Sequence, residues 1–175
     1  MHRHLAGTPD SPAAHLAETS RGDALARRLQ KSECMKATTL VGRILYSLLF
    51  IASAPGHFSS DTIGYAAAQG VPLASLAVPA SGILALLGGL SIALGYKTRL
   101  GALALIAFLV PVTFMMHNFW AVPDPAMHQL QMIMFMKNIA LIGGAMTFAV
   151  HGAGALSLDA RLERGAAGSS AAVPA

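Results

Sequence analysis

The sequence predicts an all-α polytopic membrane protein, a bundle of four transmembrane helices. Hydrophobic residues make up 54% of the 175 residues and charged residues only 11%, a balance that is unusual for a soluble fold. The hydrophobic residues also gather in long runs separated by short polar segments, whereas soluble helices and strands mix polar and apolar residues periodically. The net charge of +4 does not indicate nucleic-acid binding, because Lys and Arg stand beside the apolar runs and form no stripe.

Residues 1–36 are predicted to form a flexible tail, because Gly, Pro, Ser and charged residues dominate them, with at most a frayed helix near residues 23–30. Met35 directly precedes the first apolar run, so Met1 and Met35 are both candidate start sites. The single cysteine, Cys34, excludes an intrachain disulfide and any cysteine-based metal cluster.

The first apolar run predicts a span over residues 38–58. It contains Arg43, whose long side chain can reach the membrane interface because it stands near a helix end. Read from Met35, this stretch also resembles a secretory signal with a cleavage site at Ala52-Ser53-Ala54. Further membrane segments follow it, and no soluble domain, which favours a span.

Three more runs predict spans over residues 73–95, 100–117 and 130–150. The second span lies between Pro72 and Gly95, which are common residues at helix starts and ends. The third contains Pro111, which is expected to kink it. The four spans make up a domain over residues 37–160, and residues 161–175 are predicted to be a flexible tail.

Basic residues predict the orientation, because Lys and Arg near the spans collect on the cytoplasmic side. The loops at residues 57–72 and 118–125 contain no Lys or Arg and are expected outside, with Trp120 at the outer headgroup level. Both termini are therefore expected in the cytoplasm. The basic residues at the opposite side are Arg27, Arg28, Lys31, Lys36, Arg43, Lys97, Arg99, Arg161 and Arg164.

Small residues predict close contacts between helices. One stripe of the second span holds Gly82, Ala85, Gly89 and Ala93 at helical spacing, and the fourth span contains Gly143-Gly144.

Several short motifs, taken in order and spacing, resemble the DoxX family of small bacterial membrane proteins. The resemblance covers about residues 40–162 and implies a four-helix bundle in the bacterial inner (cytoplasmic) membrane. Family members have been linked to thiosulfate:quinone oxidoreductase subunits and to membrane assemblies that handle oxidative stress. The motifs are Gly42-Arg43, Gly70-Val71-Pro72, Leu87-Gly88-Gly89, Leu94-Gly95-Tyr96-Lys97-Thr98-Arg99, His117-Asn118-Phe119-Trp120, Phe135-Met136-Lys137-Asn138, Gly152-Ala153-Gly154 and Ser157-Leu158-Asp159.

The sequence departs from the family at one position. Ala85 stands where members commonly carry a glutamate in the second helix. If that glutamate is catalytic or handles ions, this chain lacks the group, and whether the protein is an enzyme stays open.

The candidate ligand-binding residues are His57, His117, Lys137 and Asn138, which gather toward the outward half of the bundle. Counted from Leu130, Lys137 lies about 10 Å inside a hydrocarbon core about 30 Å thick. Its side chain either extends to the outer interface or faces polar groups inside the bundle, while Asn138 points about 100° away around the helix.

The histidines leave three interpretations open. Imidazole can donate to a quinone carbonyl and exchange protons near neutral pH, so His57 and His117, with His128 nearby, indicate a quinone-contacting or proton-relaying cluster. A metal site is disfavoured, because the spans hold no short metal-ligand spacing of histidines, and Met132, Met134 and Met136 point around the helix in different directions. Ordinary interfacial histidines are the third interpretation.

The leading functional hypothesis is a membrane subunit or accessory of a redox system, with quinone as the candidate cofactor and a redox protein as partner. The alternatives are a non-catalytic membrane anchor or assembly module and, less favoured for want of intramembrane carboxylates, a small-solute transporter. The lipid bilayer is the expected environment, nucleic acid is not an expected partner, and a homo-oligomer stays open.

Overall fold

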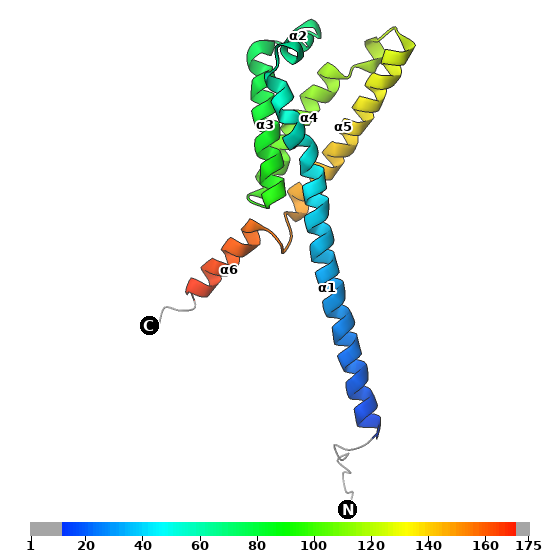
Figure 1. Ribbon diagram of the computed structural model, residues 1–175, viewed down its shortest axis with the longest axis vertical. Helices are drawn as coiled ribbons and strands as arrows, with labels where there is room; N and C mark the ends of the chain where they lie inside the picture. Colours follow the sequence, from blue (N-terminus) through cyan, green and yellow to red (C-terminus); the bar gives the residue numbers. More distant parts are fainter. Residues whose placement is uncertain (1–11, 171–175) are drawn as a thin grey trace, which may run out of the picture. The chain divides into compact units, whose positions relative to one another are not determined.

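Helices make up the whole of the regular structure in the computed structural model, which describes residues 12–170 (Figure 1). No strand occurs within those residues, which confirms the predicted all-α class. The elements in order are α1 (Pro12–Ser53), η1 (Ala54–Phe58), α2 (Ser60–Ala68), α3 (Ala74–Leu94), α4 (Thr98–Met116), η2 (Phe119–Ala121), α5 (Pro125–His151) and α6 (Leu158–Ser170).

Four stretches of the described residues are long and apolar enough to cross a membrane, as predicted. They are His15–Phe58, Ala74–Leu94, Thr98–Ala121 and Pro125–His151. The fourth helix starts at Pro125, five residues before the predicted start at residue 130. Asp124 explains this earlier start, because its carboxylate accepts a hydrogen bond from the Met127 backbone N–H at 2.8 Å, and Pro125 suits the first helical position.

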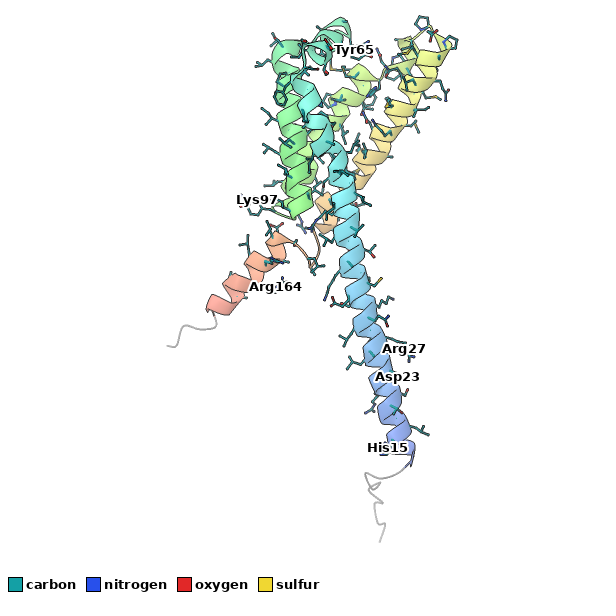
Figure 2. All side chains as sticks on the ribbon, viewed as in Figure 1. His15, Asp23, Arg27, Tyr65, Lys97 and Arg164 are labelled. Atoms are coloured by element: carbon teal, nitrogen blue, oxygen red, sulfur yellow. The ribbon has the colours of Figure 1, made fainter. Side chains whose placement is uncertain are left out.

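The chain divides into two compact units, residues 1–38 and 39–175. In the first unit the described residues belong to α1, whose side chains are mostly exposed, including those of Asp23 and Arg27 (Figure 2). The predicted tail over residues 1–36 is thus helical from Pro12 onward, and residues 1–11 lie outside the described part. Ala, Leu and Arg are frequent here, and all three are good helix formers. The predicted C-terminal tail contains most of α6.

Within the second unit, helix contacts depend on glycines at the predicted small-residue stripe of α3. A Cβ added at Gly89 would lie 3.1 Å from Ile51 Cγ1 and 3.2 Å from Phe50 Cβ, so α1 and α3 touch here. Ala85 is fully buried in the central core with Phe50, Ile92, Leu105 and Leu109. The space that the family glutamate would need is therefore filled by packed apolar side chains in this chain.

The two glycines of the predicted pair in α5, Gly143 and Gly144, have different surroundings. A Cβ at Gly144 would lie 2.7 Å from Tyr46 Cε2, so α1 and α5 pack closely there, whereas nothing lies within 4 Å of a Cβ at Gly143. Tyr46 also donates a hydrogen bond to the Leu141 carbonyl at 2.6 Å, and its ring lies 5.2 Å from the Phe148 ring. Tyr46 of α1 thus contacts α5 through both its ring and its hydroxyl.

Arg43 organises the end of the bundle that holds Lys97 (Figure 2). The side chain is 2% exposed, and its guanidinium donates to the carbonyl oxygens of Ala93 at 3.3 Å, Ala153 at 2.7 Å and Leu156 at 3.0 Å. The expected position of this guanidinium at the membrane interface stays a prediction. Within the protein the side chain is buried, and three backbone carbonyls supply the acceptors that water would otherwise provide.

Several motifs that carry the family resemblance meet around Arg43. Gly95 ends α3 at φ +67°, with Tyr96 N–H bonded to the Ser91 carbonyl at 3.0 Å. A Cβ there would lie 2.7 Å from Arg43 Nη1 and 2.5 Å from Ser157 Cβ, so only glycine fits. We call this group the Arg43 junction; it consists of Arg43, Ala93, Gly95, Ala153, Leu156, Ser157 and Asp159.

Candidate ligand pocket

A pocket of about 800 Å³ lies at the end of the bundle opposite the Arg43 junction, where Figure 2 labels Tyr65. Its walls come from η1, α2, α3 and α4, with one residue from α5. Most of the lining is apolar, and the polar side chains among the lining residues are few. They are His57, Thr62, Tyr65, Ser81, His117 and Gln131.

His57 enters the pocket wall because η1 turns the chain sharply after α1 and α3 offers a glycine opposite it. A Cβ at Gly82 would lie 2.5 Å from His57 Cβ, so the absence of a side chain at Gly82 makes the room. The imidazole lies 5.7 Å from the Phe108 ring in an edge-to-face arrangement, and its Nδ1 is 3.2 Å from the Ser53 carbonyl oxygen. Contacts with Gly82, the Phe108 ring and the Ser53 carbonyl therefore fix the position of His57.

His117 follows the last residue of α4 and joins a chain of polar side chains across three helices. Its Nδ1 lies 2.7 Å from Gln131 Oε1 of α5, and Gln131 Nε2 donates to the Tyr65 hydroxyl of α2 at 3.1 Å. Because an amide oxygen only accepts, the His117 ring donates through Nδ1–H. Its Nε2 is then an acceptor in the neutral ring, and the Tyr65 hydroxyl hydrogen is free to donate elsewhere.

The predicted site residues separate into two groups. His57 and His117 line the same pocket, whereas Lys137 and Asn138 do not. Asn138 is buried at 4% exposure, and Lys137 is exposed, with its Nζ 3.4 Å from Met134 Sδ. The depth of Lys137 in the membrane stays a prediction. Within α5 the lysine lies outside the pocket, whereas Gln131 of the same helix lines it.

Tyr65 and Gln131 line the pocket but were not among the predicted site residues. Gln131 carried a usable signal, because it is one of few polar residues within the apolar run of residues 130–150. Nothing in the sequence singled out Tyr65, because it lies between two predicted spans, where a tyrosine is common. His128, the third histidine of this end, is not in the pocket and instead lies 5.5 Å from the Phe119 ring.

Four helices of membrane-spanning length define a small polytopic membrane protein, which carries a mostly apolar pocket at one end. The chain belongs to the DoxX family, whose model matches residues 38–118, and this confirms the resemblance seen in the motifs. That match contains both His57 and His117, but ends before Gln131.

Two curated relatives from Escherichia coli (strain K12) are inner membrane proteins. The chain is 35% identical to inner membrane protein YqjF over 127 residues, which cover 71% of this chain and 92% of YqjF. It is 32% identical to inner membrane protein YphA over 124 residues, which cover 70% of this chain and 88% of YphA. No solved structure matches the chain.

Proposed function

We propose that this DoxX-family protein is a membrane subunit of a redox system and binds the head group of a quinone in the His57–His117 pocket. The volume of about 800 Å³ suits a ring-bearing ligand, since small-molecule sites commonly span roughly 300–1,000 Å³. An apolar lining with a few convergent polar groups suits a molecule that partitions into lipid and presents only its ring oxygens for hydrogen bonding.

The chain from His117 through Gln131 to Tyr65 is the observation that carries this proposal. A quinone carbonyl needs a donor and a quinol hydroxyl needs an acceptor, and a neutral imidazole close to a phenol supplies both. Histidine also exchanges protons near neutral pH, as quinone reduction requires. Electrons would come from a redox partner protein, because the residues lining the pocket are not themselves electron carriers.

A binding experiment with matched histidine variants tests the proposal. The full-length protein in detergent is titrated with a short-chain ubiquinone. His117→Ala is expected to weaken binding about tenfold, which corresponds to about 1.4 kcal/mol. His128→Ala is the control, because His128 lies at the same end but outside the pocket, and it should bind as the wild type does.

Two results would contradict the quinone proposal. The first is saturable binding that His117→Ala and His57→Ala both leave unchanged, and the second is the absence of binding to the folded wild-type protein. Lys137→Ala should leave quinone affinity unchanged, because the lysine does not line the pocket.

We also propose an inner-membrane location with both termini in the cytoplasm. The Arg43 junction end carries Lys97 and Arg99, whereas the loops beside the pocket carry Asp61 and Asp124 and no Lys or Arg. The pocket would then open toward the outer half of the membrane.

A non-catalytic assembly module is the second candidate function. One observation favours it, because Lys137 is an exposed cation inside an apolar helix and serves no contact with the pocket. Quinone binding separates the two candidates, since an assembly module has no reason to bind a quinone.

A further inference from the structure

Lys137 is exposed near the middle of a helix that is long enough to span the membrane. It stands twelve residues after Pro125 and fourteen before His151, the two ends of α5. At about 1.5 Å per residue it lies about 18 Å along the helix from Pro125. Half of a hydrocarbon core is only about 15 Å thick. Lys137 therefore lies well inside the core whether the distance is counted from Pro125, about 18 Å, or from Leu130, about 10 Å.

The lysine continues a face of α5 that α1 covers only in part. Leu141, Gly144 and Phe148 follow Lys137 at helical spacing, and all three contact Tyr46 of α1. Toward the Pro125 end the same face is uncovered, because Leu130, Ile133 and Lys137 are all exposed. We call these three residues the Lys137 face.

Lys137 has no carboxylate partner in the part of the chain that the structure describes. Its recorded hydrogen bond goes to Met134 Sδ, a weak acceptor. Ionisable side chains at this depth are almost always paired or face a water-filled cavity. The pocket does not supply such a cavity, because Lys137 is absent from its lining.

We infer that the Lys137 face binds a transmembrane helix of another protein, and that this helix carries an Asp or Glu at the depth of Lys137. Charge complementarity decides the kind of partner. A second copy of this chain cannot supply the carboxylate, because residues 38–58, 73–95, 98–121 and 125–151 contain no Asp or Glu. Lipid phosphates lie in the headgroup layer, outside the hydrocarbon core.

A reconstituted system tests the charge requirement directly. The full-length protein is placed in phosphatidylcholine vesicles with a labelled poly-leucine transmembrane peptide that carries one central Glu, and association is followed by energy transfer. We expect association at least tenfold stronger than with an all-leucine peptide. Lys137→Met should abolish this difference, while Lys97→Met, at the residue directly before α4, should preserve it.

The inference fails if both peptides associate equally, or if Lys137→Met leaves the preference for Glu intact. Lys137 is exposed, so folding of Lys137→Met is expected to be unaffected; its thermal unfolding in detergent verifies this. The charge-reversed pair, Lys137→Glu with a central-Lys peptide, should restore association.

A second experiment asks what covers the face in a living cell. A photo-crosslinking amino acid replaces Ile133, which adjoins Lys137, or Ile139, which lies about 160° around the helix from it. Both are exposed isoleucines of the same helix. We expect Ile133, and not Ile139, to crosslink to a transmembrane segment that contains Asp or Glu. Crosslinks only to lipid, or only to another copy of this chain, would overturn the inference.

Discussion

Arg43 shows how one charged residue can be structural inside a membrane protein. Its guanidinium has three separate carbonyl oxygens within hydrogen-bond distance, from α3 and from the segment between α5 and α6. A lysine could not reproduce this, because an ammonium is a single compact charge whereas a guanidinium carries donors on three nitrogens in a fixed plane.

Replacing Arg43 should therefore destabilise the bundle. We expect Arg43→Met to lower the free energy of unfolding by roughly 3 kcal/mol, because charge-assisted hydrogen bonds are lost and buried carbonyls are left unpaired. Arg43→Lys should recover only part of the loss. Unfolding in mixed detergent measures both variants, and Arg27→Met, in the exposed part of α1, is the control. Equal stability of Arg43→Met and the wild type would refute the assigned role.

Glycines offer a second test at the residue scale, because two of them differ in what a methyl group would meet. Gly82→Ala should push His57 aside, since the new Cβ would lie 2.5 Å from His57 Cβ, and overpacking of this kind costs about 1–3 kcal/mol. Because His57 lines the pocket, the affinity of Gly82→Ala for quinone should fall as well. Gly143→Ala meets nothing within 4 Å and should be neutral or slightly stabilising. If both variants have the same stability and the same quinone affinity, the close contact between Gly82 and His57 contributes to neither property.

At the scale of elements, the N-terminal end of α4 is capped by a side chain from a distant part of the chain. The Asp159 carboxylate of α6 accepts from the backbone N–H of Lys97 at 2.9 Å and of Thr98 at 3.3 Å. No local side chain caps α4, since the preceding residue is Lys97 in a left-handed conformation. A carboxylate at this place also interacts favourably with the helix dipole.

Removing that cap should loosen the start of α4 without opening the pocket. We expect Asp159→Ala to cost about 1 kcal/mol and to speed amide hydrogen exchange at Lys97 and Thr98. Exchange at residues around His117, at the far end of α4, should not change. Asp61→Ala, an exposed acidic residue in the first turn of α2, provides the comparison. Unchanged exchange at Lys97 in Asp159→Ala would show that the cap is dispensable.

The bounds of α3 and α4 were predictable from sequence, whereas the early start of α1, the helices α2 and α6, and the neighbours of each side chain were not. Apolar runs and glycine ends placed α3 and α4 within two residues of their observed starts and ends. The same runs placed His57 and His117 at one end of the bundle, and both line one pocket there. The neighbours of α5 include Tyr46, which packs against Gly144 although the two are 98 residues apart in sequence, so sequence alone could not show that Lys137 lies outside the pocket. Whether the pocket binds a quinone stays a prediction.

For the whole molecule, topology can be tested with fused reporters. We expect alkaline phosphatase inserted after Asp124 to be active, because this loop lacks Lys and Arg and should face outward. Green fluorescent protein fused after Ala175 should fluoresce, as it does in the cytoplasm. Inactive phosphatase after Asp124, with an active fusion at the C-terminus, would invert the proposed orientation.

The Arg43 junction also sets an order of events during synthesis. Arg43 emerges from the ribosome early, but its acceptor carbonyl at Ala153 follows 110 residues later. At 5–20 residues per second, the arginine waits roughly 5–20 s before its partner exists. During that interval the guanidinium lacks the Ala153 and Leu156 carbonyl acceptors that it has in the finished protein. Completion of the Arg43 junction is therefore tied to the segment after α5, and a nascent chain that stops before Ala153 leaves Arg43 without two of its three acceptors.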